Sequence, residues 1–287
     1  QGGKTLMIDQ TFKYENWSKE LRECYDRFPE LKIVFTGSSV MRLKEENEDL
    51  QDIVASYNLR GFSFREFLNL QTNLGLKHYT LDEIIHNHTS IAQQICSKVK
   101  PLDYFGDYLH HGFYPFFLEN RNFSENLLKT MNMMLEVDIL LIKQIDLKYL
   151  SKIRKLLYIL MNSSPAGPNV SQLSVEIETS RATIMNYIKY LQDARLLNLL
   201  YIEGETFPKK PKQVYVQNTN LMYVINKENV DQDAVRKTFF YNALHSRHKV
   251  NVSKYQNDFC IDGKLHFKCD NSKMHKTGSK TYFAVDE

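Results

Sequence analysis

A strand–helix–strand pattern at the amino end constrains the fold of this chain more than any other feature. Thr5–Ile8 is a short apolar run without polar alternation, as expected of a strand buried on both faces in a parallel sheet. Residues 17–28 carry apolar side chains at helical spacing, Pro29 follows, and residues 31–35 form a second apolar run. These elements and their short connections predict a βαβ unit whose two strands are parallel neighbours.

Polar residues follow both strands at their carboxyl ends. Asp9 ends the first strand, and a Thr-Gly-Ser-Ser run begins at Thr36 after the second. In a parallel sheet these ends lie side by side, at the edge where α/β sheets bind ligands. Taken singly, an aspartate after a strand often caps a helix, and such a run often forms a turn. Because a βαβ unit brings both positions to one edge, together they favour a ligand site.

Composition excludes several classes of protein. The chain has 287 residues, of which 43% are hydrophobic and 25% charged, which indicates a globular protein with more than one core. It has neither an apolar run of about 18 residues nor a signal-peptide pattern, so we expect a cytoplasmic protein without a membrane partner. The net charge of +3 is too small to indicate nucleic-acid binding by itself. Four cysteines without a CxxC pair disfavour a disulfide scaffold or a thiolate zinc site.

Several segments, in order along the chain, resemble one known family. LMIDQTFKYENWSKELRECYDRFPELKIVFTGSS (residues 6–39) resembles the Walker B to sensor 1 stretch of a bacterial and archaeal family of AAA-type P-loop ATPases. In that family a winged helix and a restriction-nuclease-like domain of unknown function follow the ATPase module. Later landmarks of the family resemble LRGFSFREFLNL (59–70), YLHHGFYPFF (108–117), NTNLMYVI (218–225), VRKTFFYNAL (235–244) and DFCIDGKLHF (258–267).

The resemblance implies nucleotide chemistry at the edge of the first sheet. Asp9 takes the position of the Walker B aspartate, which holds the Mg²⁺ of MgATP, usually through water. Gln10 stands where the family has a glutamate that polarises the attacking water. An amide can orient a water but cannot accept its proton, so hydrolysis is expected to be weak or absent. The other implied nucleotide-binding positions are Thr36, Ser38 and Ser39 in the sensor 1 region, and Arg60, which resembles an arginine near the family's phosphates or inter-subunit surface.

A phosphate-binding loop is missing from these residues. No G-x-x-x-x-G-K-S/T sequence occurs, and the Gly-Gly-Lys-Thr at residues 2–5 runs straight into the first strand, without the loop before it or the helix after it. We therefore interpret residues 2–5 as a coincidental match. The chain is either a fragment or a degenerate member of the family. Mg-ATP is expected as a cofactor only where the missing segment is present.

Residues 71–161 predict a helical connector. Thr80 and Glu83 have the spacing of a capping box and open a helix. Histidines two residues apart face different sides of a helix, and adjacent ones cannot easily share an ion. We therefore expect no metal site at the four candidates, which are His86, His88, His110 and His111.

Residues 162–217 predict a winged helix. A Pro- and Gly-containing linker is followed by two helices joined by a turn, then by two strands joined by a basic turn. Residue types that suit phosphates and base edges lie on the second helix and the basic turn, namely Arg181, Thr183, Asn186, Lys189, Lys209, Lys210 and Lys212. Because the second helix has no dense basic cluster, a role as a lid or protein-partner surface stays open beside duplex DNA binding.

Residues 218–287 resemble the family's nuclease-like domain in degenerate form. Such a fold needs a helix glutamate, a strand aspartate and a Glu-x-Lys on the next strand to hold a divalent metal and activate water. Here the helix position is Lys237, the aspartate remains as Asp258, and the last motif reads Lys268, Cys269 and Asp270. One carboxylate is too few for a metal site, so we expect no nuclease activity.

The prediction is therefore a mixed fold in four units. They are a partial AAA-type α/β module (1–70), a helical connector or lid (71–161), a winged helix (162–217) and a small α/β nuclease-like domain (218–287). The predicted function is ATP binding with weak or no hydrolysis. The alternatives are a non-enzymatic winged-helix module that binds DNA, and an interaction module with a protein partner or a second copy of itself.

Overall fold

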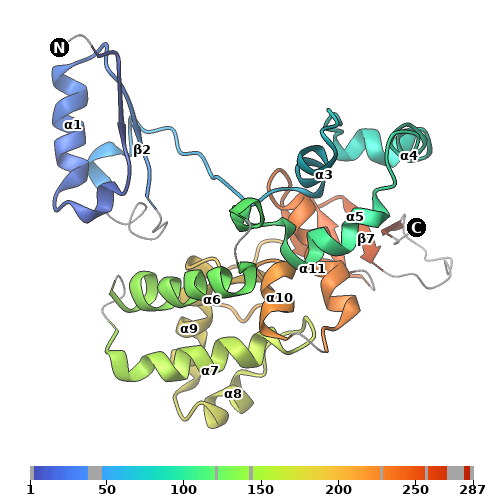
Figure 1. The fold of residues 1–287 in the computed structure, drawn as a ribbon. Coiled ribbons are helices and arrows are strands. Elements are labelled where there is room, and N and C mark those ends of the chain that lie inside the picture. The colour runs from blue at the N-terminus through green and yellow to red at the C-terminus, as the bar shows by residue number, and fades with distance from the viewer. Residues whose placement is uncertain are drawn as a thin grey trace.

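The chain divides into a small amino-terminal unit and a larger body (Figure 1). A computed structural model describes residues 3–37, 47–119, 122–141, 145–226, 229–255, 258–269 and 281–284. Residues 54–63 form neither helix nor strand and run as an extended connection between the two parts. Helices combined with small sheets agree with the predicted α/β class. In the ranges described, no helix is long and apolar enough to cross a membrane.

The amino-terminal unit is a βαβ unit, as predicted. Its described elements are β1 (Thr5–Ile8), the 3-10 turn η1 (Thr11–Lys13), α1 (Trp17–Arg27), β2 (Lys32–Phe35) and the 3-10 turn η2 (Glu48–Leu50). β1 and β2 pair in parallel, with Thr5 opposite Lys32 and Ile8 opposite Phe35. The carboxyl ends of the two strands therefore lie side by side.

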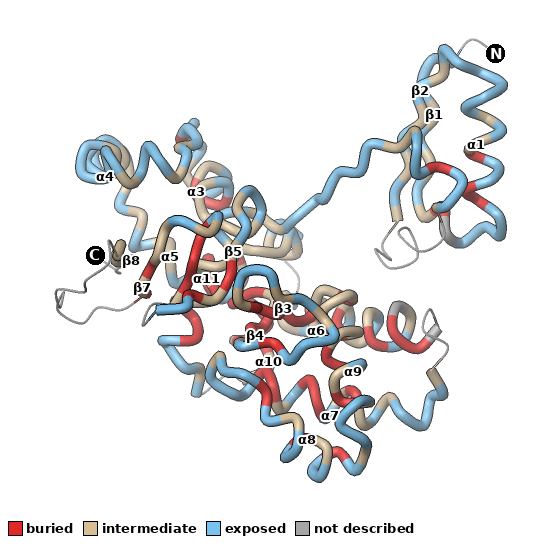
Figure 2. The backbone as a smooth tube through the Cα atoms, turned by 180° about the vertical axis from the view of Figure 1, so that it is seen from behind, coloured by how far each residue is buried: buried red, intermediate tan, exposed pale blue. Residues whose placement is uncertain are grey.

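The prediction that these strands are buried on both faces is wrong. Met7 is 76% exposed and Val34 is 45% exposed, and because they pair across the two strands they lie on the same face of the sheet. Figure 2 colours β1 and β2 as exposed and intermediate in alternation, without a buried residue. α1 covers the other face, where the rings of Trp17 and Phe35 lie 5.4 Å apart. Parallel sheets normally carry helices on both faces. In the part of the chain that the structure describes, only one face is covered, so exposure alternates along each strand.

The first half of the body is helical. Its elements are α3 (Phe64–Thr72), α4 (Leu81–Cys96), α5 (Leu102–Asp107), the π-helical η3 (Tyr108–Gly112), η4 (Pro115–Glu119), α6 (Phe123–Met133), the π-helical η5 (Met134–Leu141), η6 (Leu147–Tyr149) and α7 (Leu150–Met161). The predicted capping box opens α4. Oγ1 of Thr80 accepts the N–H of Glu83 at 3.2 Å, and the Glu83 carboxylate accepts the N–H of Thr80 at 2.7 Å.

Two helices and an antiparallel pair of strands come next. They are α8 (Val170–Glu176), α9 (Arg181–Asp193), β3 (Leu197–Leu200) and β4 (Gln213–Val216). The core beneath them continues into α6, α7 and α10 (Thr219–Ile225), and includes Leu127, Ile153, Leu173, Ile188, Leu199, Val214 and Leu221. One core therefore runs across both ends of the segment 162–217.

A four-stranded sheet with one helix completes the body. Its elements are α11 (Gln232–Leu244), β5 (Val250–Val252), β6 (Phe259–Ile261), β7 (Leu265–Cys269) and β8 (Thr281–Ala284), with strand order β5-β6-β7-β8. β7 and β8 are parallel, and the other pairs are antiparallel. Leu199 and Val214 of the β3–β4 pair belong to the helical core, whereas Leu200 and Tyr215 pack with Phe259 of this sheet. The β3–β4 pair is thus buried between two cores.

A buried asparagine joins α10 to η3. Nδ2 of Asn220 donates to the carbonyls of Tyr108 at 3.0 Å and Leu109 at 2.8 Å, and its Oδ1 accepts the N–H of Phe113 at 2.9 Å. The side chain is fully buried. Because a buried amide group costs free energy unless its hydrogen bonds are satisfied, these three hydrogen bonds fix α10 against η3.

Candidate functional site

Asp9 and Thr36 meet where β1 and β2 end. Oγ1 of Thr36 donates a hydrogen bond to Oδ1 of Asp9. Backbone hydrogen bonds close the same edge, because the N–H of Thr36 donates to the carbonyl of Ile8 at 2.9 Å and the N–H of Thr11 donates to the carbonyl of Thr36 at 3.2 Å. The prediction that these two polar side chains lie together is confirmed.

Gln10 turns the chain immediately after Asp9. Its backbone is left-handed, with φ of 58°, a conformation that costs a non-glycine residue roughly 1 kcal/mol. Gln10 and Asp9 line a pocket of about 590 Å³, together with Lys13, Tyr14 and Trp17 among others. The positions implied for metal binding and for water activation therefore share one surface.

The edge offers a carboxylate oxygen to a ligand. Asp9 is exposed, and its Oδ2 forms no hydrogen bond with any residue that the structure describes. A free carboxylate oxygen at a strand end suits a hard cation held through water. Within the described ranges, no Gly-rich loop leading into a helix stands beside it. Ser38 and Ser39 lie outside the described residues.

The structure does not bring Arg60 to this edge. Arg60 lies where the extended connection reaches the body, and its Nη1 contacts Nε2 of His245, just after α11. Beside this contact, Nη2 of Arg195 donates to Oδ1 of Asn58. Figure 1 shows the amino-terminal unit held away from the body. Arg60 therefore belongs to a junction between the connection and the body.

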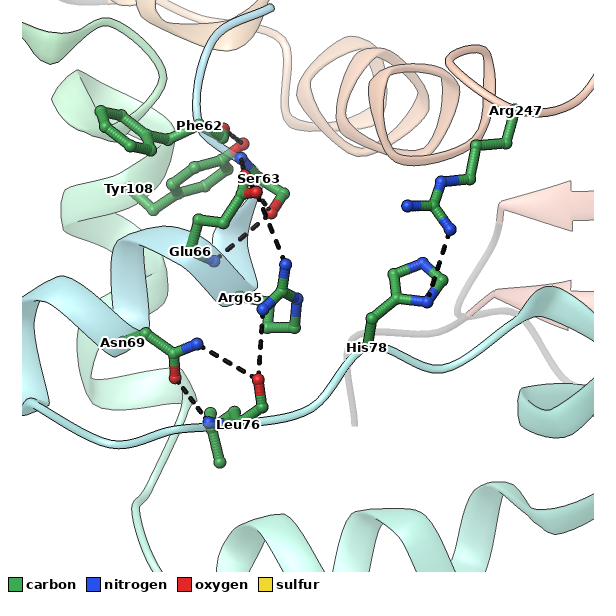
Figure 3. Close-up of polar contacts among 9 residues, drawn as sticks. All are labelled: Phe62, Ser63, Arg65, Glu66, Asn69, Leu76, His78, Tyr108 and Arg247. Atoms are coloured by element: carbon green, nitrogen blue, oxygen red, sulfur yellow. Dashed lines mark hydrogen bonds and ion pairs between the residues drawn. The ribbon is translucent and has the colours of Figure 1, made fainter.

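Polar side chains of the segment 59–70 form hydrogen bonds within the first elements of the body (Figure 3). The N–H of Ser63 donates to the carboxylate of Glu66 at 2.9 Å. Asn69 holds both backbone groups of Leu76, accepting its N–H at 2.8 Å and donating to its carbonyl at 3.2 Å. Burial raises the pKa of Glu66, but the hydrogen bonds from Ser63 and the charges of Arg65 and Arg247 together outweigh burial, so the net pKa is lowered. The polar groups of this segment therefore have structural partners.

α9 presents two of its four predicted nucleic-acid contacts to solvent. Arg181 and Asn186 are exposed. Oγ1 of Thr183 lies 2.8 Å from the hydroxyl of the residue that caps the helix. Lys189 forms an ion pair with Asp193 at 2.7 Å. Arg181 and Asn186 are the two that remain available for a ligand.

The turn between β3 and β4 adds exposed lysines. Lys209 forms an ion pair with Glu205 at 3.0 Å. Lys210 and Lys212 are both exposed. The available positive charge on this turn therefore comes from Lys210 and Lys212.

The positions predicted for a degenerate metal site meet between α11 and the last sheet. Nζ of Lys237 lies 2.7 Å from Asp233 and 3.1 Å from Asp258, which also accepts the N–H of Cys269 at 2.8 Å. Burial lowers the pKa of Lys237, but both carboxylates outweigh burial and raise it, so an ammonium group fills this position. Asp270 lies outside the described residues. In the portion that the structure describes, no three His, Cys, Asp or Glu side chains form a group that could hold a metal ion.

Two parts of the chain match known domain families. Residues 1–68 match an AAA domain. Residues 102–211 match a domain of unknown function (DUF8612). An uncharacterized protein of Methanocaldococcus jannaschii, MJ1637, is 27% identical over 212 residues, which are 72% of this chain and 44% of that protein. No solved structure matches the chain.

The AAA match spans the whole edge that carries the candidate site. It includes β1, α1 and β2 with the contact between Asp9 and Thr36, and it ends within α3. It supports an AAA-like relationship for this part of the chain. The chain spans less than half the length of the M. jannaschii relative. The second match, from α5 to the turn before β4, carries no functional description.

Proposed function

We propose that the amino-terminal unit is the magnesium side of an AAA-type nucleotide site and that the protein binds MgATP. The contact between Asp9 and Thr36 carries the proposal, because it lies at the carboxyl ends of parallel strands inside the segment that matches an AAA domain. In such sites a strand-end aspartate orders the metal, and a polar side chain of the next strand reaches the γ-phosphate or the water. Ser38 and Ser39 are proposed to share the role of Thr36.

A Walker A segment has to supply the phosphate cradle, and residues 1–287 contain none. Bound magnesium would neutralise phosphate charge at this edge. Asp9 would hold it through water, and Thr36 keeps the carboxylate in place. Because residues 1–287 lack that segment, we expect this chain to bind MgATP more weakly than a chain that includes it.

A calorimetric titration with MgATP tests the proposal. Asp9→Asn keeps the shape of the side chain and the acceptor for Thr36 but removes the negative charge, so we expect it to abolish binding. Glu30→Gln is the matched control, because Glu30 is exposed in the same unit and away from the edge. Absence of binding by the wild-type protein, or equal binding by Asp9→Asn, would overturn the proposal.

We further propose that Gln10 keeps hydrolysis weak. Its amide cannot accept a proton from water, whereas a positioned general base contributes roughly 10²- to 10⁴-fold to a rate. Gln10→Glu is therefore expected to raise ATP hydrolysis by about this factor under conditions in which ATP binds. If binding is intact and the rate does not rise, Gln10 is not at the position of the base.

A second candidate function is DNA binding by a winged helix formed by α8, α9, β3 and β4. The exposed side chains of Arg181 and Asn186 on α9, and of Lys210 and Lys212 on the turn, support it. Fluorescence anisotropy with a duplex is expected to show affinity falling steeply with salt, with a slope reduced by about 0.9 for each phosphate contact removed. Lys210→Ala with Lys212→Ala removes two exposed charges, and Lys32→Ala on the amino-terminal unit is the control. Binding of neither duplex nor nucleotide would leave the protein-interaction alternative.

We also propose that the last domain has a nuclease-like fold without nuclease activity. The arrangement of Lys237 beside Asp258 supports this, because an ammonium group stands where the resemblance implies a metal. Incubation of the protein with plasmid DNA and Mg²⁺ is expected to leave the plasmid intact. Cleavage that persists after a final purification step and is lost in Asp258→Asn would contradict this proposal.

A further inference from the structure

Two arginines lie close enough for their charges to interact where the connection reaches the body, and neither has an acidic partner among the described residues. Arg60 contacts the ring of His245, and Arg195 donates to the amide oxygen of Asn58. Neither arginine forms an ion pair with a residue that the structure describes. Three other arginines of the body have acidic partners, in the pairs Arg65–Glu66, Arg154–Glu136 and Arg236–Asp233. Arg181 and Arg247 form no ion pair with a described residue either, but the charge of neither acts on a second described arginine as that of Arg60 acts on Arg195. The pair of Arg60 and Arg195 therefore keeps its positive charge.

A neutral histidine holds Arg60 in place. Nδ1 of His245 lies 3.1 Å from the carbonyl of Tyr241, to which it donates, so Nε2 carries the lone pair that accepts from Arg60. The ring of His245 also stacks on Tyr241, with centroids 4.5 Å apart. Burial and then the charge of Arg60 lower the pKa of His245 to about 4. The imidazole is thus neutral near pH 7 and orients the guanidinium without cancelling its charge.

Arg195 occupies a backbone position that favours glycine. Its φ is 58°, and it follows the end of α9, where the N–H of Leu196 donates to the carbonyl of Leu191 at 2.9 Å. Helices commonly end in this way with glycine in the left-handed position. Burial, and then the charge of Arg60, lower the pKa of Arg195. Strained backbone positions cluster at functional sites, and here the strained, half-buried residue is an arginine near a second positive charge.

We propose that Arg60 and Arg195 form a binding site for a phosphate group at this junction. Guanidinium groups bind phosphate oxygens through paired N–H donors, and two of them match its charge. The phosphate can belong to a nucleotide or to the backbone of DNA. A phosphate bound by both arginines would hold the extended connection, which carries Asn58 and Arg60, against the end of α9. The site is separate from the edge at Asp9, so it does not depend on the nucleotide proposal.

Calorimetric titration with pyrophosphate tests the site in the whole protein. Arg60→Gln and Arg195→Gln each remove one charge-assisted donor and are expected to weaken binding about tenfold or more, and the double variant is expected not to bind. Arg27→Gln is the matched control, since Arg27 is exposed at the end of α1. Absence of binding by the wild-type protein, or equal binding by the double variant, would overturn the proposal.

Further variants separate folding, geometry and the source of the phosphate. Circular dichroism melting shows whether Arg195→Gln is folded; if it is not, Arg60→Gln at an exposed side chain decides. Arg195→Lys keeps the charge but loses the paired donors, so we expect intermediate affinity. The titration is run without divalent cations, so the edge at Asp9, which is proposed to bind phosphate only through Mg²⁺, does not contribute. Displacement of pyrophosphate by ATP identifies a nucleotide as the source, and displacement by duplex DNA identifies the DNA backbone.

Discussion

The amino-terminal unit and the body bury their side chains to very different extents. In the body one core runs from α3 to α11, and a second lies beneath β6 and β7. Among the described residues of the unit, the buried hydrophobic core consists of Trp17, Leu21 and Leu50, and most of the unit is coloured as exposed or intermediate in Figure 2. The exposed Met7 and Val34 lie on one face of its sheet. The side chains that carry the nucleotide proposal thus lie in the less buried part.

This difference indicates that stability and proposed chemistry are separated along the chain. Sheets of fewer than three strands have little stability of their own unless they pack against other elements. The unit is therefore expected to open at a lower free energy than the body, as regions with few buried contacts do. Substitutions in one part should leave the other part folded.

Trp17→Ala is expected to have the largest effect, because it removes the main side chain of the smaller core. Truncation of a buried aromatic residue costs about 3–5 kcal/mol, which is enough to unfold the unit. Limited proteolysis should then cut within it, while the melting transition of the body is unchanged. Tyr25→Ala, at a side chain 42% exposed on the same helix, is the control. A parallel loss of stability in the body would show that the two parts fold as one.

Leu156→Ala tests the opposite side of the comparison. Leu156 is fully buried in the helical core, so we expect a loss of about 3 kcal/mol in the free energy of unfolding of the body. Denaturant unfolding measures this, with Val175→Ala, at a side chain 79% exposed, as the control. Protection of the unit against hydrogen exchange should stay the same. A change in the hydrogen-exchange protection of the unit would mean that its stability depends on contacts with the body.

The stability of the body is expected to fall as the pH decreases. Burial and the charge of Arg60 lower the pKa of His245 to about 4 from an ordinary value of 6.5, so between these values the unfolded chain binds a proton that the folded body does not. The loss begins below pH 6.5, is complete below about pH 4, and is of the order of 3 kcal/mol. His245→Phe keeps a ring beside Tyr241 and should remove this part of the decline in urea unfolding. An identical pH profile in the variant would contradict the assignment.

Met7→Thr is expected to have the smallest effect. Met7 is 76% exposed on the open face of the sheet, and substitutions at exposed sites usually change stability by less than about 0.5 kcal/mol. Hydrogen exchange of the β1 and β2 amides measures the local opening energy. A loss of several kcal/mol would mean that another element or molecule covers this face in solution.

Local sequence patterns predicted those parts of the fold that are determined by residues close together in the sequence. Apolar runs located β1 and β2, the short connections predicted their parallel pairing, and this pairing predicted the meeting of Asp9 and Thr36. The capping box at Thr80 was predicted in the same way. The exposed face of the sheet was not predictable from the sequence. An apolar run predicts that a strand is buried, but it does not say which other element covers each face of the strand.

Contacts between distant segments could not be predicted. Asn220 forms hydrogen bonds with η3, more than 100 residues away in the sequence. Arg60 contacts His245, which is 185 residues further along the chain. The resemblance implied that Arg60 lies near the phosphates or at an inter-subunit surface; the fold places it at the junction, away from Asp9, and leaves the inter-subunit alternative a prediction. Arg195 carried no local signal in the sequence, because only its backbone conformation and its neighbours distinguish it.

Hydrogen exchange of the whole protein, with and without millimolar MgATP, tests the central claim most directly. The account predicts that amides of β1, α1 and β2 exchange faster than those of α7 and α9. It also predicts that MgATP slows exchange around Asp9, Gln10 and Thr36 and leaves α7 unchanged. Equal protection of the two parts, with no effect of MgATP at this edge, would contradict both the separation into unit and body and the nucleotide-binding role.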